Sequence, residues 1–236
     1  MKKRKAYKSL TVINSFLFLM ILAFQVWKME KNQEEEAMLQ TTVKEKEEDS
    51  QIKPKIALTF DDGPHPIYTP MLLEGLRERR VNASFFLIGK NIEGNEEIVK
   101  QMAEQGHLIG NHTYHHVNVG ELSAQEACNE MIMTSDLVEE ITGETTCYIR
   151  PPFGVWDEDL DCGIDMISVM WTIDPLDWTT KNVSQVVEKV VTEAEENDII
   201  LLHDCYESSV KAALQIVDRL QAEGFEFVTV DELILE

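Results

Sequence analysis

Two adjacent carboxylates, Asp61 and Asp62, directly follow an apolar run in the first third of the chain. Residues 55–58 have the pattern of a buried β-strand, and Gly63-Pro64 end that strand just after the pair. At the end of a strand, one carboxylate can bind a metal ion while the other moves a proton. The alternative is a structural turn cap, so a chemical role depends on partners elsewhere in the sequence.

Candidate metal ligands occur in the segment His112-Thr113-Tyr114-His115-His116. Histidines four residues apart can present both imidazoles on one side of a helical turn. With Asp62, His112 and His116 would supply two nitrogen ligands and one oxygen ligand, leaving a position for water. Zinc hydrolases use such sites, non-haem iron oxygenases use the same ligand set, and a surface histidine cluster is the structural alternative. His115 is interpreted as a neighbour of the site.

Three further polar positions are candidates for the same chemistry. Arg150 precedes Pro151-Pro152, and a cation on such a stiff loop can hold a carboxylate ionised and oriented. The segment Asp174–Trp178 offers two carboxylates and an aromatic ring, and His203 ends the apolar run 199–203. Taken singly, each has an ordinary structural explanation.

The elements that must position these residues alternate along the chain. Apolar runs predict strands at 55–60, 83–88, 107–111, 147–150, 165–173, 198–203 and 225–230. Helical periodicity predicts helices at 68–80, 95–105, 123–142, 184–196 and 207–223, with Gly106, Gly143 and Gly224 where helices should stop. This alternation predicts parallel strands, in a barrel or in an open sheet.

All of the candidate residues follow predicted strands. They lie after the first strand (Asp61, Asp62), the third (His112), the fourth (Arg150), the fifth (Asp174, Asp177) and the sixth (His203). In a (β/α) barrel the carboxyl ends of the strands converge on the face that carries catalysis. The sequence therefore predicts one shared site.

The amino terminus has a different composition. Five basic residues between Lys2 and Lys8 precede an apolar stretch, 10–27, which as a helix would span about 27 Å. We interpret residues 1–28 as a basic cytoplasmic tail and a transmembrane signal anchor, with the catalytic domain outside the cell. The alternative is a cleaved signal peptide and a secreted protein.

The remaining residues divide into an acidic stalk or linker, 29–53, and a catalytic domain, 54–236. The formal net charge of −22 argues against nucleic-acid binding, and nothing indicates an oligomeric state. The four cysteines form no CxxC pair, which argues against a structural zinc site and a thioredoxin motif. Disulfides and free thiols both remain open.

Five ordered segments together resemble a known family. Residues 59–64, 112–116, 150–154, 174–178 and 201–203 resemble the five motifs of the NodB-homology polysaccharide deacetylases, carbohydrate esterase family 4. The resemblance covers about residues 53–236, with all five motifs intact, and excludes the amino-terminal segments. It implies a distorted (β/α) barrel. The predicted strands described above give this barrel about seven parallel strands.

The resemblance also implies a role for each motif residue. Asp62, His112 and His116 would bind one divalent metal ion, most often zinc, with cobalt or nickel as alternatives. Asp61 would be the general base and Arg150 would orient it.

The remaining roles concern the leaving group and the substrate. His203 would be the general acid, oriented by Asp177. The backbone N–H of Phe153 would hold the oxyanion, and Trp178 and Leu201 would border the substrate, Trp178 as an apolar wall for the acetyl methyl group.

The implied activity is metal-dependent removal of N-acetyl groups from a glycan. A domain tethered to the membrane reaches cell-envelope glycans, so we expect peptidoglycan N-acetylglucosamine as substrate, ahead of chitin-like oligosaccharides. An O-acetyl xylan esterase is a further alternative within the family. A glycan-binding protein without turnover is disfavoured, because the motif positions for acid, base and metal ligands are all intact.

Overall fold

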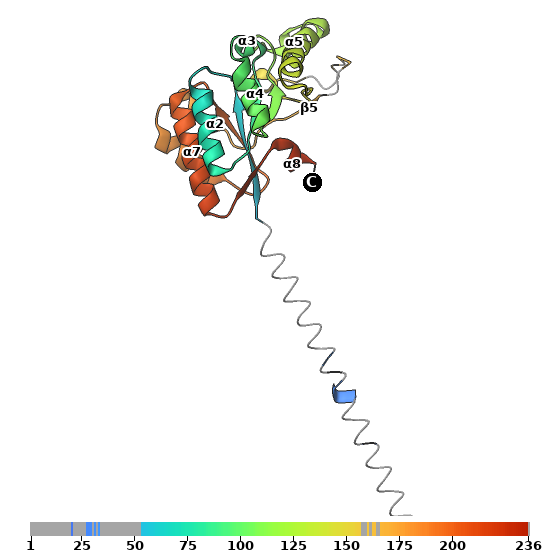
Figure 1. The fold of residues 1–236 in the computed structure, drawn as a ribbon, viewed down its shortest axis with the longest axis vertical. Coiled ribbons are helices and arrows are strands. Elements are labelled where there is room, and N and C mark those ends of the chain that lie inside the picture. Colours follow the sequence, from blue (N-terminus) through green and yellow to red (C-terminus); the bar gives the residue numbers. More distant parts are fainter. Residues whose placement is uncertain are drawn as a thin grey trace, which may run out of the picture. The chain divides into compact units, whose positions relative to one another are not determined.

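We describe the protein from a computed structural model. It describes residues 53–156, 160, 162–163 and 166–235, together with residues 20, 27–29, 31 and 33. Contacts divide the chain into two units, 1–52 and 53–236, and the second unit carries all the candidate site residues (Figure 1). The predicted anchor and stalk lie almost wholly outside the described residues, and among those described no helix is long and apolar enough to cross a bilayer.

The described part of the second unit contains one sheet of seven strands, ordered β5-β4-β3-β2-β1-β6, with β7 also paired to β1. The strands are β1 (Lys55–Asp61), β2 (Ser84–Leu87), β3 (Leu108–Asn111), β4 (Tyr148–Ile149), β5 (Ile167–Ser168), β6 (Ile199–His203) and β7 (Glu226–Val228). Every pairing is parallel, as the sequence predicts. The sheet is curled into a half-barrel, consistent with the predicted distorted barrel.

Strand β1 is the centre of this sheet and of the core. Its residues Ile56, Leu58 and Phe60 are at most 1% exposed, as expected for a parallel strand covered on both faces. The register places Asp61 opposite His203 of β6 on one side and Phe86 of β2 on the other. The two polar residues therefore meet at the carboxyl end of the sheet.

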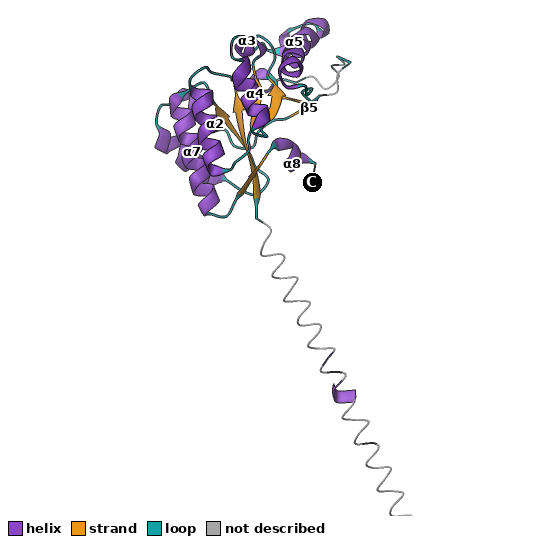
Figure 2. Ribbon diagram, viewed as in Figure 1, coloured by secondary structure: helices purple, strands orange, loops and turns teal. Residues whose placement is uncertain are grey.

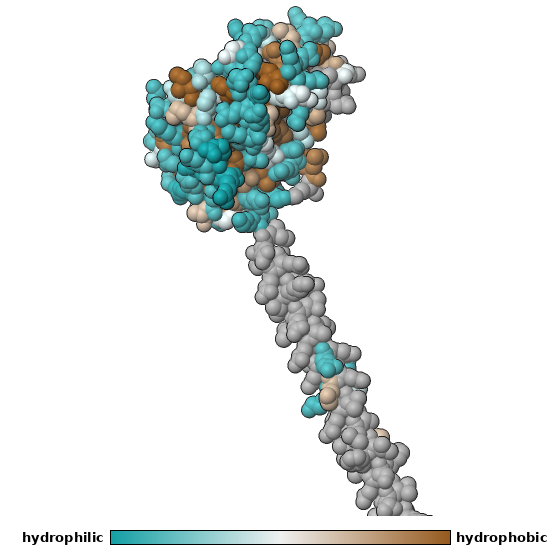
Figure 3. Space-filling model, in the orientation of Figure 1, coloured by the Kyte–Doolittle hydropathy of each residue, from teal (hydrophilic) through white to brown (hydrophobic). Residues whose placement is uncertain are grey.

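The five predicted helices are confirmed. The helices are α2 (Tyr68–Arg79), α3 (Gly89–Ile92), α4 (Glu96–Glu104), α5 (Ala124–Thr142), α6 (Val183–Glu193), α7 (Glu207–Ala222) and α8 (Val230–Ile234). Helices α2 and α7 lie side by side, and the strands pass behind them and behind α4 (Figures 1 and 2). The outer surfaces of these helices are mostly hydrophilic, with apolar side chains scattered among polar ones (Figure 3).

The predicted strand at 165–173 is wrong in its length, because only Ile167–Ser168 form β5. The next two carbonyl groups, those of Val169 and Met170, accept hydrogen bonds from the Arg150 side chain. The chain then turns back to the sheet, where Ile173 forms an isolated parallel bridge with Ile200. This apolar run thus supports a buried cation in addition to forming a strand.

A disulfide joins Cys128 of α5 to Cys162, while Cys147 and Cys205 are free thiols. The side chain of Cys162, like those of Trp156 and Met166, packs against a small apolar cluster: Val119, Ile149 of β4, and Ala127 and Met131 of α5. The disulfide therefore ties α5 to the connection between β4 and β5.

Candidate active site

A cleft of about 360 Å³ opens at the carboxyl ends of the strands. Of the predicted site residues, it is lined by Asp61, Asp62, His112, His116, Phe153, Trp178, Leu201 and His203. The other two, Arg150 and Asp177, are buried and hydrogen-bonded to Asp61 and His203. The structure thus brings all ten together, six of which the sequence places at the ends of predicted strands: Asp61, Asp62, His112, Arg150, Asp177 and His203.

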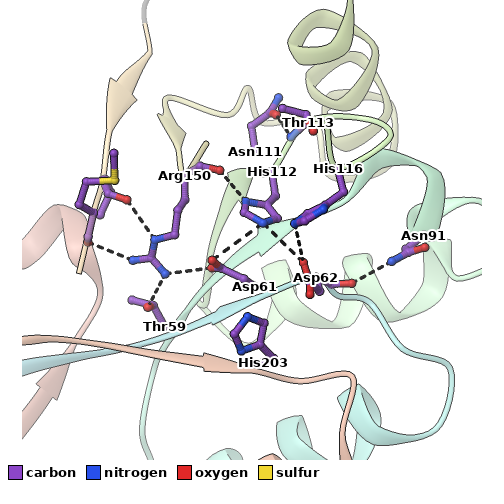
Figure 4. A network of polar contacts seen from close by, with 12 residues as sticks. Thr59, Asp61, Asp62, Asn91, Asn111, His112, Thr113, His116, Arg150 and His203 are labelled. Carbon is purple, nitrogen blue, oxygen red and sulfur yellow. Dashed lines mark hydrogen bonds and ion pairs between the residues drawn. The ribbon is translucent and has the colours of Figure 1, made fainter. Parts of the chain in front are cut away.

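Asp62, His112 and His116 form the one group of potential metal ligands found among the described residues, with ligand atoms within 4.8 Å of one another. The Nε2 atoms of His112 and His116 lie 3.5 Å and 3.4 Å from Oδ1 of Asp62 (Figure 4). That carboxylate oxygen is buried and has no hydrogen-bond partner within the described structure. Two imidazole nitrogens and an unsatisfied carboxylate oxygen fit a divalent metal ion.

The predicted helical turn between the two histidines is wrong. Thr113 and His116 have left-handed backbones, with φ of 60° and 56°, and the segment forms bends. The carboxamide oxygen of Asn111, at the end of β3, accepts the Thr113 N–H at 2.8 Å. The imidazoles therefore converge through a tight turn fixed by an asparagine.

Two hydrogen bonds fix the orientation of the ligand groups (Figure 4). Nδ1 of His112 lies 2.5 Å from the carbonyl oxygen of Arg150, so this nitrogen carries the proton and Nε2 is free to coordinate. Asp62 has a left-handed backbone, with φ of 72°, and the Asn91 side chain donates to its carbonyl oxygen at 2.8 Å. Both ligands are thus held before any ion binds.

The charge states of the ligand side chains also suit a metal. Burial raises the pKa of Asp62. The opposite effect of the neighbouring imidazoles, mainly that of His112 and then those of His203 and His116, is larger, so the pKa of Asp62 lies below its ordinary value. Burial, with the charge of His112, lowers the pKa of His116. At neutral pH these groups are a carboxylate and a neutral imidazole, which are the ligating forms.

Arg150 is 0% exposed and forms the floor beneath Asp61. Its Nη1 donates to Oδ1 of Asp61 at 2.9 Å and to the Thr59 hydroxyl at 2.7 Å. The guanidinium also lies 4.3 Å from the centre of the Phe86 ring. These contacts fix both the cation and the carboxylate that it holds.

On the β6 side, His203 is bound twice to the buried Asp177. Nδ1 of His203 lies 2.8 Å from Oδ1 of Asp177, and the backbone N–H donates to Oδ2 at 2.9 Å. Burial disfavours the charged imidazole, but the Asp177 hydrogen bond and charge, together with Asp61 and Asp62, raise the pKa of His203 to about 9. The imidazole is therefore protonated at neutral pH.

Apolar side chains border the opening of the cleft. Phe153 has a left-handed backbone, with φ of 62°, and no described residue accepts its N–H. Its ring lies 4.9 Å from that of His116. Trp178 is 55% exposed, whereas Leu201 is buried in the wall.

Sequence reasoning missed several residues of the cleft. The cleft is also lined by Trp171, Tyr206 and Pro151. The sequence placed Trp171 in a predicted strand, Tyr206 shortly after His203 and Pro151 next to Arg150, but assigned none of them to the site. Asp174, which was a candidate from the sequence, lines the cleft too, while its Oδ1 accepts the Leu176 N–H, a structural role for this carboxylate.

A buried carboxylate behind the cleft was also missed. Asp204 accepts a hydrogen bond from the Thr69 hydroxyl and packs against Gly63, where a Cβ atom would lie 2.5 Å from its Oδ2. Burial raises the pKa of Asp204 to about 7. A side chain at position 63, in the loop that carries Asp62, would therefore displace the Asp204 carboxylate.

Two other histidines have structural partners. The Nδ1 atom of His115 lies 2.8 Å from Oε1 of Glu130, and His115 is not part of the group of potential metal ligands. His65 accepts the backbone N–H groups of Ile67 and Tyr68.

Comparisons with known proteins agree with this geometry. The family described as polysaccharide deacetylase matches residues 48–166. The peptidoglycan-N-acetylmuramic acid deacetylase PdaC of Bacillus subtilis is 35% identical over 75% of this chain and 38% of its own length, so the chain spans well under half of that relative. A peptidoglycan-N-acetylglucosamine deacetylase of Bacillus cereus is 37% identical over 76% of this chain and 87% of its own.

Comparison of the fold with solved structures agrees with the sequence comparisons. The solved structure of peptidoglycan deacetylase PdaC from Bacillus subtilis superposes with a TM-score of 0.74, at 35% identity, over 77% of this chain and 90% of that one. This chain belongs to the polysaccharide deacetylase family.

Proposed function

We propose that the protein is a metal-dependent hydrolase that removes N-acetyl groups from N-acetylglucosamine residues of peptidoglycan. One observation carries the proposal: Asp62, His112 and His116 face the same cleft as a carboxylate held by Arg150 and an imidazolium held by Asp177. Amide hydrolysis needs a polarised carbonyl, a base and an acid, and this cleft has candidates for all three.

Asp62, His112 and His116 hold the ion, which we propose to be zinc, with cobalt or nickel as alternatives, since two nitrogens and one oxygen suit it. The chemistry that a divalent ion supplies when bound there is polarisation of the acetyl carbonyl and acidification of water.

Asp61 removes the proton of the attacking water. The Nη1 atom of Arg150, at 2.9 Å, holds this carboxylate in place at the cleft. The Phe153 N–H, free of any acceptor in the described structure, donates to the oxyanion of the tetrahedral intermediate. Leu201 and Trp178 form the apolar wall against which the acetyl methyl group rests.

His203 donates its proton to the departing nitrogen, because an amide anion is too basic to leave. Asp177 stabilises the imidazolium and, by binding Nδ1, leaves the Nε2 proton for transfer. The base and the acid thus come from neighbouring strands, β1 and β6, whose register places Asp61 opposite His203.

The choice of peptidoglycan is supported by the names of the relatives above. Chitooligosaccharide deacetylases are also among the relatives, for example one of Sinorhizobium fredii that is 32% identical over 64% of this chain and 72% of its own length. Chitooligosaccharide deacetylation is therefore the second candidate function, ahead of O-acetyl xylan hydrolysis.

We further propose that residues 10–27 anchor the protein in the membrane, with the catalytic domain outside the cell. The basic cluster Lys2–Lys8 supports this orientation, and the Cys128–Cys162 disulfide is a bond that persists in oxidising, extracytoplasmic surroundings. Amino-terminal sequencing of the native protein tests it: an intact start is expected, and a mature terminus beyond Trp27 would show a cleaved signal peptide and a secreted protein.

The experiment that tests the activity uses the full chain loaded with zinc. Peptidoglycan, N-acetylglucosamine oligomers and acetylated xylan are supplied separately, and acetate and new amino groups are measured. The highest kcat/KM is expected on peptidoglycan, with equal amounts of acetate and amine. A preference for the xylan ester without amine formation would overturn the choice of substrate.

A further inference from the structure

Two smaller clefts adjoin the catalytic cleft. One, of about 260 Å³, is lined by Asp62, His65, Lys90, Asn91 and Glu93 among others, and so shares Asp62 with the catalytic cleft. The other, of about 350 Å³, is lined by Tyr68, Lys181, Tyr206, Glu207 and Lys211 among others, and shares Tyr206. Cys205 lines both. The two smaller clefts therefore border the catalytic cleft, each through one shared lining residue.

Each smaller cleft contains one exposed lysine without an ionic partner. Neither Lys90 nor Lys181 forms an ion pair or a side-chain hydrogen bond with a described residue, and both side chains are exposed. The chain as a whole carries a net charge of −22, so these two lysines are local positive charges on an acidic protein.

The other charged groups in these clefts are already engaged. Glu207 pairs with Lys211 at 2.6 Å, and Glu93 accepts a hydrogen bond from the Tyr114 hydroxyl. The ring nitrogen of His65 accepts two backbone N–H groups. Lys90 and Lys181 therefore remain the cations available to a ligand in the two clefts.

We propose that Lys90 and Lys181 are carboxylate-binding subsites that select acidic glycans over neutral ones. This proposal rests on the proposed function, because the carboxylate must belong to the polymer whose acetyl group lies at Asp61. In peptidoglycan a free carboxylate occurs either on the lactyl ether of a muramic acid that lacks a stem peptide or within the stem peptide itself, whereas chitin-like oligomers have none. The two lysines would thus distinguish the first candidate substrate from the second.

The size of the effect follows from the exposure of both side chains. An exposed ion pair is weak, so each lysine should change KM by roughly two- to fivefold. Added salt should remove most of this difference, because exposed charges are screened within about 10 Å at 0.1 M ionic strength. Glutamate in place of lysine should have the larger effect, because it adds repulsion.

The test compares Lys90→Gln, Lys181→Gln and the double variant with Lys100→Gln in the full chain. Lys100 is an exposed lysine of α4 that lines none of the three clefts, so its variant is the matched control. The substrates are neutral N-acetylglucosamine oligomers, peptide-free strands with lactyl carboxylates, and strands whose lactyl groups are joined to stem peptides. The measured quantity is the ratio of kcat/KM on each acidic substrate to that on the neutral one, at low and high salt.

We expect this ratio to fall by roughly fourfold or more in the double variant, through KM, and to stay constant in Lys100→Gln. A fall on the peptide-free strands assigns the lactyl carboxylate, and a fall only on peptide-bearing strands assigns the stem peptide. An unchanged ratio on both acidic substrates would overturn the proposal. If the unmodified chain releases no acetate from any substrate, the proposed function is refuted instead. The lysine subsites are then tested by calorimetry, which compares the affinities of the unmodified chain and the double variant for the same soluble fragments.

Discussion

The Arg150 guanidinium and the Asp61 carboxylate are joined at 2.9 Å while both side chains are at most 5% exposed. Such a buried pair is costly to desolvate and stable only when its remaining hydrogen bonds are made. Here the guanidinium also donates to the Thr59 hydroxyl and to two carbonyl groups of the segment after β5. The pair therefore couples the position of the proposed base, at the end of β1, to the ends of two other strands, β4 and β5.

Replacing Arg150 with lysine should damage both stability and turnover. Lysine keeps the charge but cannot make the forked set of bonds to Asp61, Thr59 and the two carbonyl groups. We expect a loss of roughly 3 kcal/mol in the free energy of unfolding, measured by urea denaturation, together with a large fall in kcat. Arg79→Lys is the control, because Arg79 pairs with Asp218 near the surface and should cost less than about 1 kcal/mol. Equal urea midpoints for the two variants would contradict this account of Arg150.

The proposed metal site gives a sharper prediction. Alanine at Asp62, His112 or His116 should remove both the stoichiometric ion and the activity, because each change leaves only two of the three ligands. Asp61→Asn should retain the ion but lose most turnover. Metal content by atomic spectroscopy separates the two classes.

His115→Ala is the matched control for that experiment, since its neighbour His116 is a proposed ligand while His115 pairs with Glu130. It should keep both the ion and the activity. Stoichiometric metal in His116→Ala would show that the ligand set is wrong.

The raised pKa of His203 predicts how activity depends on pH. The proposed acid is active when protonated, so activity should persist to a pH near 9 and fall above it. In Asp177→Asn burial is no longer opposed by the paired carboxylate, so the basic limb of the kcat/KM profile should move to lower pH. The same pair stabilises the fold below the ordinary histidine pKa, and this contribution is lost as pH rises through about 9.

His203→Ala tests the role of the imidazole directly. Loss of a general acid typically costs about 100- to 10,000-fold on an amide, and far less on an ester with a good leaving group. Rates on an amide substrate like those of the unmodified chain would exclude His203 as the acid.

The Cys128–Cys162 disulfide should contribute measurably to stability. It closes a loop with a sequence separation of 34, and such cross-links typically contribute about 2–4 kcal/mol by restricting the unfolded chain. Cys128→Ser should lower the urea midpoint accordingly, and reductant should have no further effect on it. Cys147→Ser, at a free exposed thiol, should leave the midpoint unchanged.

Much of the framework could be predicted because it depends on local patterns. The continuous apolar run at β1 and the glycine stop of α5 at Gly143 fix elements without reference to the rest of the chain. The positions of Asp61 and His203 after parallel strands then predict that they meet.

The features that sequence analysis predicted wrongly or missed depend on contacts between segments that are distant in the sequence. The turn that brings His116 to Asp62 depends on Asn111, whose carboxamide is itself held by α5. The partner of Cys128 could not be predicted, since its loop has no periodic pattern. Asp204 has no local signal at all, because its environment comes from Thr69 and Gly63, far away in sequence.

The most direct test of the central claim is product analysis with peptidoglycan and the full, zinc-loaded chain. Our account predicts equal amounts of acetate and free glucosamine amine, both abolished by chelation and restored by added zinc. Release of acetate and amine that continues undiminished in the Asp62→Ala variant, or acetate without any new amine, would contradict it.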